Sequence, residues 1–149
     1  MAKLNNDVPD PIGAKESDYL YLKPSGIVNA GKGLFTSIRI YENEVISLFK
    51  GEILSNKEAV LRAKHKLDGY FISMLDGTIM DSNHVTCFAK YANDAEAYHK
   101  RMFKNNSKIA LNEHGQVCLV ALRDIKMREE IFCGYGKKYW QNFHLSDSH

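Results

Sequence analysis

The sequence predicts a mostly β, β-rich α+β fold in which several small sheets accompany one main helix. From Tyr19 onward, short apolar stretches alternate with Gly-centred turns, a pattern typical of many short strands. One segment, residues 55–69, combines helical spacing with a marked start and stop. Strands and helices do not alternate regularly, which argues against a parallel βαβ sheet. A chain of 149 residues is the size of one domain and can bury a core.

The chain divides by composition into three parts. Residues 1–17 are polar and interrupted by Pro9 and Pro11, so we expect a flexible N-terminal arm. We expect residues 18–140 to form the folded domain and residues 141–149 a C-terminal tail. The start has no apolar stretch for a signal peptide, and no apolar run approaches the ~20 residues that cross a bilayer. These features predict an intracellular protein without membrane contact.

The main helix is predicted to begin after Ser55, because Ser55 and Glu58 have the spacing of a capping box. Val60, Ala63 and Leu67 then fall on one face of the helix, and Gly69 is a suitable residue to end it. The opposite face carries four basic residues and is predicted to be solvated: Lys57, Arg62, Lys64 and Lys66.

Two hairpins are predicted after this helix. Asp76-Gly77 separates the apolar runs 70–75 and 78–80, which is a strong hairpin signal. A second hairpin is expected where residues 108–111 meet residues 117–122 across the turn 113–116. Between the hairpins, residues 94–103 can hold a short helical turn.

The charge pattern argues against a dedicated nucleic-acid binder. The formal net charge is only +2, far from a dense Lys/Arg field. A modest basic cluster surrounds Phe103: Lys100, Arg101, Lys104 and Lys108. A small basic nucleic-acid-binding β protein therefore stays open as an alternative, but we do not expect nucleic acid as a direct ligand.

The cysteines leave a zinc site open as an alternative. His84 with Cys87 and His114 with Cys118 supply two His and two Cys ligands. Their spacings are loose, and Cys118 lies in an apolar run where a buried thiol is common. With Cys133, the three cysteines are widely scattered, which fits a reducing compartment. We expect no metal.

Three fragments carry candidate chemistry. In residues 30–35, two close glycines let the backbone turn tightly or approach a ligand, without the pattern of a phosphate loop. In residues 91–94, Asn93 and Asp94 supply an amide and a carboxylate, although such pairs usually form turns. In residues 134–136, two glycines leave the hydroxyl of Tyr135 sterically open.

In their order along the chain, these fragments resemble the SET domain. The order is Gly31-Lys-Gly-Leu-Phe35, Lys50-Gly-Glu-Ile53, Asn93-Asp94, Arg123-Asp-Ile125 with Glu129-Glu130-Ile131, and Gly134-Tyr135-Gly136. The resemblance runs from about Tyr19 to Trp140. It implies a C-terminal pseudoknot and an S-adenosylmethionine-dependent protein-lysine N-methyltransferase. The implied partner is a protein or peptide that presents a lysine, histones among them; the oligomeric state is open.

The resemblance also implies residue roles. Tyr135 falls on the catalytic tyrosine. The expected cofactor contacts are the backbone of Lys32, Gly33 and Leu34, Tyr70 at the methionine part, Asn93 at its amino group, the main chain of Asp94 at the adenine, and Trp140 as an aromatic lid. Tyr91 and Cys133 are expected in the substrate channel.

Three positions depart from the family pattern. Asp94 stands where His is usual, and Arg128 where Gly is frequent. Cys133 replaces an aromatic residue, which predicts room for more than one methyl group. Asp94 and Arg128 keep a second function class open, a non-catalytic SET-like interaction module. Retention of both Asn93 and Tyr135 argues against that alternative.

Overall fold

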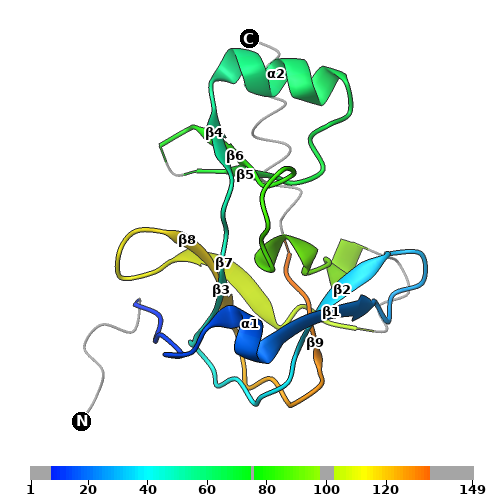
Figure 1. Cartoon of the computed structure of the whole chain (residues 1–149), viewed down its shortest axis with the longest axis vertical. Helices are drawn as coiled ribbons and strands as arrows, with labels where there is room; N and C mark the ends of the chain where they lie inside the picture. The colour runs from blue at the N-terminus through cyan, green and yellow to red at the C-terminus, as the bar shows by residue number, and fades with distance from the viewer. Residues whose placement is uncertain (1–7, 75, 98–102, 135–149) are drawn as a thin grey trace.

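The computed structural model describes residues 8–74, 76–97 and 103–134, and in these residues the fold is built from small antiparallel sheets (Figure 1). Three sheets have three strands each. The first has the order β1 (Leu20–Pro24), β2 (Lys32–Thr36), β9 (Glu130–Ile131). The second has the order β3 (Val45–Leu48), β8 (Val117–Ala121), β7 (Ser107–Leu111). The third has the order β4 (Glu52–Leu54), β6 (Ile79–Asp81), β5 (Phe71–Ser73). The predicted mostly β class is confirmed.

Helices are few and short in the described part of the chain. The main helix is α2 (Asn56–Lys64), and α1 (Glu16–Tyr19) is a single turn. Two 3-10 turns follow, η1 (Ala89–Tyr91) and η2 (Ala95–Ala97), the second within the predicted helical turn. None of the helices in the described residues is long and apolar enough to span a membrane.

Helix α2 begins as predicted but buries a different face. The Ser55 hydroxyl accepts a hydrogen bond from the backbone N–H of Glu58 at 3.2 Å, which confirms the cap. Ala59 and Ala63, four residues apart, face the third sheet, whereas Val60 and Leu67 are 36% and 52% exposed. Small alanine side chains let the helix approach the sheet closely, so alanines rather than the larger residues form the contact.

The helix also ends earlier than Gly69. The last helical residue is Lys64, and Lys66 adopts a left-handed backbone with φ 60°. The N–H of Leu67 then donates back to the carbonyl of Arg62 at 2.9 Å, which closes the end of the helix. A lysine therefore takes the left-handed position that the sequence pattern assigned to glycine.

Both hairpins are confirmed. Strands β5 and β6 pair around the Asp76-Gly77 turn, where Gly77 has φ 88°. Strands β7 and β8 pair over five positions, and their turn is closed by the N–H of Asn112 donating to the carbonyl of Gln116. Both turns place glycine at positive φ, where it costs least.

The core is divided unequally between the two ends of the molecule. The larger cluster packs under the first two sheets and contains Leu34, Ile46, Leu119, Ile125 and Ile131, none with any exposed surface. A smaller cluster lies between α2 and the third sheet: Leu54, Ala59, Phe71 and Ile79. Figure 1 shows α2 and the β4–β6–β5 sheet at one end, with the other two sheets at the other.

The N-terminal segment is attached where it is described. The N–H of Asp10 donates to the carbonyl of Asn43, and the N–H of Val45 donates to the carbonyl of Asp10. Pro9 is buried. Residues 8–17 thus lie against the body, and the boundaries of arm, domain and tail stay predictions. The predicted pseudoknot involves residues after Gly134, outside the described part of the chain.

Candidate functional site

Two predicted cofactor residues, far apart in sequence, meet at the edge of the first sheet. The side-chain amide of Asn93 donates to the carbonyl of Lys32 at 3.1 Å. The carbonyl of Asn93 accepts from the N–H of Cys133 at 2.9 Å. Asn93 therefore joins the glycine-flanked turn at the start of β2 to the segment that leads toward Tyr135.

Only the start of the glycine-containing segment is open. Gly31 has φ 72°, and Gly31 and Lys32 are exposed. Gly33 and Leu34 are buried, and the Leu34 side chain belongs to the core. A ligand can therefore approach the backbone at Gly31 and Lys32. The Leu34 side chain packs in the core and holds the strand in place.

Tyr70 and Tyr91 lie together around a cation that the sequence analysis did not single out. Their ring centroids are 6.5 Å apart, and the Lys90 ammonium lies 5.1 Å and 5.4 Å from the two rings. Such geometry is attractive because the ring faces carry negative charge. Lys90 also donates to the carbonyls of Ser82 and Val85, each at 3.0 Å. Its position in the same segment as Asn93 and Asp94 was the signal that could have identified it.

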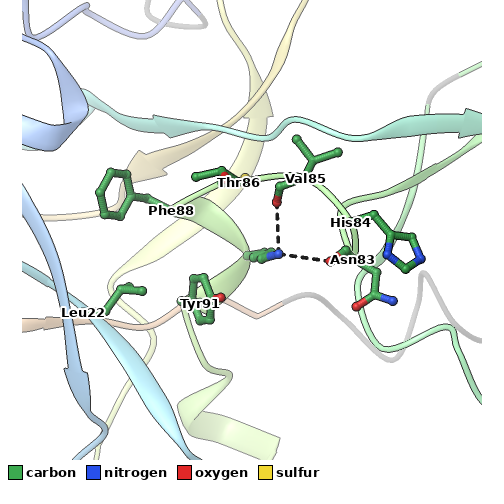
Figure 2. Close-up of a pocket in the computed structure, with 9 residues that line it drawn as sticks. Leu22, Asn83, His84, Val85, Thr86, Phe88 and Tyr91 are labelled. Atoms are coloured by element: carbon green, nitrogen blue, oxygen red, sulfur yellow. Dashed lines mark hydrogen bonds between the residues drawn. The ribbon is translucent and has the colours of Figure 1, made fainter.

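A cavity of about 340 Å³ lies beside this cluster. Figure 2 shows Leu22 and Tyr91 on one side of it and Asn83, His84 and Val85 on the other. Tyr91, predicted to line the substrate channel, is half-buried and contributes to the cavity wall. The cavity therefore lies directly beside one of the predicted site residues, Tyr91.

The Asp94 side chain accepts hydrogen bonds from the η2 turn and from Asn105. Its Oδ1 accepts from the N–H of Glu96 and from the side-chain amide of Asn105, both at 3.0 Å. Asn105 Oδ1 in turn accepts from the N–H of Ala95 at 2.8 Å. The turn-forming tendency of Asn-Asp noted in the sequence is realised here. The carboxylate closes the η2 turn, which gives the departure from histidine a structural reason.

Cys133 is fully buried within the larger core cluster. Burial raises the pKa of its thiol to about 12, so the group is neutral near pH 7. Tyr135 and Trp140 lie outside the described residues, and so does the channel wall that they would complete. The roles of all three residues stay predictions.

The zinc alternative finds no assembled ligand set in the described residues. Cys118 is buried in β8, and burial raises its thiol pKa to about 11. His114 is exposed in the β7–β8 turn. Within residues 8–74, 76–97 and 103–134, no three His, Cys, Asp or Glu side chains gather as metal ligands would.

Two polar residues that the sequence analysis missed fix the strand leading to Tyr135. Asn106 has no exposed surface; its amide donates to the carbonyl of Glu130 and accepts from the N–H of Phe132, each at 2.9 Å. Glu130, 7% exposed, accepts from Ser25 and Gly26 at the far end of β1. In the sequence, Glu130 appeared only as part of the Glu129-Glu130-Ile131 fragment, and no pattern of neighbouring residues singles out Asn106.

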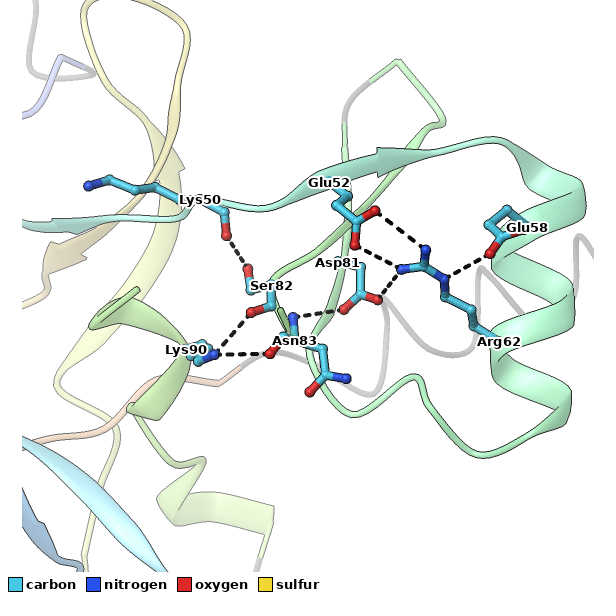
Figure 3. A network of polar contacts seen from close by, with 8 residues as sticks. All are labelled: Lys50, Glu52, Glu58, Arg62, Asp81, Ser82, Asn83 and Lys90. Carbon is cyan, nitrogen blue, oxygen red and sulfur yellow. Dashed lines mark hydrogen bonds and ion pairs between the residues drawn. The ribbon is translucent and has the colours of Figure 1, made fainter. Parts of the chain in front are cut away.

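A polar network ties α2 to the third sheet (Figure 3). Asp81 has no exposed surface, and its Oδ2 accepts from Arg62 at 2.7 Å. Arg62 also pairs with Glu52 at 3.2 Å and with Glu58 at 3.0 Å, which raises its pKa. The prediction that Arg62 belongs to a merely solvated helix face is therefore wrong, because the buried Asp81 draws it inward.

The profile of the SET-domain family matches residues 31–136. The chain belongs to the SET-domain family. The match includes the glycine-containing turn at Gly31, Asn93 and the end of β9, the elements that converge in the geometry above. The expected order of SET-domain segments is thus confirmed at the level of the family.

Relatives of this SET domain include the histone-lysine N-methyltransferase EZH2 of Chaetomium thermophilum, 26% identical over 131 residues. The match covers 79% of this chain and 8% of that protein. Solved structures from the same organism are similar. An autoinhibited Polycomb Repressive Complex 2 bound to S-adenosylmethionine has TM-score 0.67 and 25% identity, over 87% of this chain and 16% of that one. A humanized mutant bound to the inhibitor GSK343 has TM-score 0.64 and 27% identity, over 80% and 15%. The chain therefore spans a small fraction of its relatives' length.

Proposed function

We propose that this SET domain is an S-adenosylmethionine-dependent protein-lysine N-methyltransferase. The observation that carries the proposal is the hydrogen bond from the Asn93 amide to the Lys32 carbonyl. It assembles, from segments 61 positions apart, the two parts that the family resemblance assigns to the cofactor. The S-adenosylmethionine-bound relative supports the choice of cofactor.

The described residues offer suitable groups for such a cofactor. The open backbone at Gly31 and Lys32 can accept and donate hydrogen bonds at close range. The amide of Asn93 points at this turn and can also contact an amino group. Tyr70 supplies an aromatic face next to Tyr91. Asp94 would contribute its main chain, since its carboxylate is occupied by Asn105.

The cofactor would supply a methyl group activated on a sulfonium. The work left to the protein is alignment, because methyl transfer is an in-line displacement. The target lysine must be neutral to attack, whereas a free lysine has a pKa of ~10.4. An apolar channel would lower that pKa by disfavouring the charged form. The neutral thiol of Cys133 adds no charge to such a channel. In this proposal the Tyr135 hydroxyl orients the amine.

The proposed substrate is a lysine-bearing protein or peptide. Histones are the first class to test, because the Chaetomium thermophilum relative is named for histone-lysine methylation. An intracellular, chromatin-associated location belongs to the same proposal.

The proposal is tested by transfer of labelled methyl from S-adenosylmethionine to histones, whole-cell protein and the chain itself. Tyr135→Phe and Asn93→Ala are each expected to lower transfer on the order of a hundredfold, because alignment supplies most of the rate. Matched controls are Tyr41→Phe and Asn56→Ala, both at exposed positions away from the site. No transfer by the native chain, with no thermal stabilisation by the cofactor, would favour the non-catalytic interaction module.

A further inference from the structure

A buried carboxylate, that of Glu130, bonds to the loop between β1 and β2. Glu130 is 7% exposed, yet among the described residues no Lys, Arg or His forms an ion pair with it. Its Oε2 accepts from the Ser25 hydroxyl at 2.6 Å, and its Oε1 accepts from the N–H of Gly26 at 2.8 Å. Burying a carboxylate is costly unless strong hydrogen bonds compensate, so these two bonds are expected to be important.

The two bonds organise the loop between β1 and β2. The Ser25 hydroxyl oxygen also accepts from the N–H of Ile27 at 3.0 Å. The N–H of Ser25 donates to the carbonyl of Gly31 at 2.8 Å, across the base of the loop. Two hydrogen bonds, both made by Ser25, thus connect the carboxylate to the backbone of Gly31.

Gly33 makes this arrangement possible. A Cβ atom at position 33 would collide with the carboxyl group of Glu130. Gly33 is buried and pairs with Lys23 in β1, so its backbone has little room to move away. Glycine at position 33 therefore lets the Glu130 carboxyl group lie against the backbone of β2.

The main chain of Glu130 lies in β9, the strand that leads toward Tyr135. Its carbonyl is held by Asn106, and its chain continues through Phe132 and Cys133 toward Tyr135. One residue therefore bonds the loop next to the proposed cofactor turn through its side chain and continues into the tyrosine segment through its backbone.

We propose that Glu130 is a positioning residue that sets the cofactor turn at Gly31 and Lys32 relative to the strand leading to Tyr135. It acts through Ser25 and Gly26 and does not itself touch the reacting atoms. The inference rests on the proposed function for its effect on cofactor binding. Its effect on the loop is independent of that function.

The test compares Glu130→Ala and Glu130→Gln with the native chain. Glu130→Ala removes both bonds and is expected to weaken S-adenosylmethionine binding about tenfold, with a matching rise in the cofactor KM and a smaller change in kcat. Glu130→Gln should restore binding to within about threefold, because an amide can accept from Gly26 and donate to Ser25. Glu129→Gln is the matched control, since Glu129 pairs with Arg123 at the surface; it should bind within about twofold of native.

Amide hydrogen exchange provides a readout that needs no cofactor. Glu130→Ala should accelerate exchange at Gly26 and Ile27, whereas Glu129→Gln should not. Unchanged exchange at both amides would overturn the proposal even if the native chain is an active enzyme. If the native chain binds no S-adenosylmethionine, the proposed function fails, and faster exchange in Glu130→Ala still supports the positioning role. Should Glu130→Ala not fold, Ser25→Ala removes one of the two bonds and is expected to weaken binding about threefold.

Discussion

Burial determines the chemistry of several single side chains in this protein. Cys133 and Cys118 have no exposed surface, and burial raises their thiol pKa values to about 12 and about 11. The thiolate is the reactive form of cysteine, so both side chains are held in the unreactive state near neutral pH. They behave as small apolar residues.

This predicts that the folded protein resists thiol alkylation at Cys118 and Cys133. At about pH 8, an unperturbed thiol reacts through a substantial thiolate fraction, whereas these two should stay unmodified for hours. Mass spectrometry after iodoacetamide treatment measures the labelling site by site. The denatured chain is the control and should be labelled at all three cysteines. Rapid labelling of Cys133 in the folded state would contradict its placement in the core.

The resemblance predicted single residues better when both partners belonged to the fragments that carry it. Asn93 and Lys32 were both assigned to the cofactor, and they meet. Asn106 was missed because its hydrogen-bond partners, Glu130 and Phe132, lie in a distant segment of the chain and leave no local pattern. Asp94 shows the converse: its departure from histidine is explained by Asn105, which no motif includes.

At the scale of elements, the attachment of α2 to its sheet depends on a small contact area. Two alanines face the sheet, so apolar burial by the helix is limited. The buried Asp81, bonded to Arg62 and to the N–H of Asn83, provides a polar connection beside it. Asp124 has the same bonding pattern, to Arg39 and to the N–H of Glu42, but it is exposed.

Asp81 and Asp124 allow the loss of a buried carboxylate to be compared with the loss of an exposed one that has the same bonding pattern. Asp81→Ala should lower the free energy of unfolding by about 2 kcal/mol, because it removes a fully buried acceptor that bonds both Arg62 and the N–H of Asn83. Asp124→Ala should cost only a small fraction of that amount, since water can replace its carboxylate. Urea denaturation of the two variants and the native chain measures both values. Equal losses would mean that burial of Asp81 does not matter to the stability of the α2 end.

The elements themselves were predicted where the signal is local. The Ser55 cap and the Asp76-Gly77 turn each depend on residues within a few positions, and both are confirmed. The buried face of α2 was predicted only in part, because the helical spacing of Val60, Ala63 and Leu67 placed all three on one face, and only Ala63 packs against the sheet. Which face a helix buries depends on the partner sheet, and this information is not contained in the helix sequence.

At the scale of the whole molecule, exposed carboxylates link stability to pH. The pKa of Glu52 is lowered from 4.5 by its hydrogen bond with Arg62. The pKa of Asp76 is lowered from 3.8 by Thr78, and that of Asp124 by the N–H of Glu42 and by Arg39. In each case the folded protein holds the charged form more firmly than the unfolded chain does.

The sign of the effect follows from linkage. A carboxylate with a lowered folded pKa contributes stability above its unfolded pKa and loses it as the pH falls through the folded value. We therefore expect these carboxylates to make a constant contribution to the free energy of unfolding between about pH 7 and 5. Below about pH 4.5 that contribution should fall. Urea midpoints across this range measure the trend. A midpoint that rises on acidification would contradict it.

The mostly β class was predictable from the whole sequence, but the joining of the sheets was not. Hairpins such as β7–β8 are encoded by their turns. The pairing of β3 with β8 and of β2 with β9 joins distant strands, and its register depends on packing of the complete core. The resemblance to a known family supplied what local patterns could not.

The close contact between Gly33 and the Glu130 carboxyl group also constrains how this sequence can change over evolution. A larger residue at position 33 would push the Glu130 carboxyl group off its bonds to Ser25 and Gly26 unless position 130 becomes shorter. Conversely, once position 130 is short, selection for glycine at position 33 is relaxed on this side of the strand. The two positions therefore form an epistatic pair, and among descendants of this gene they are expected to vary together rather than one at a time.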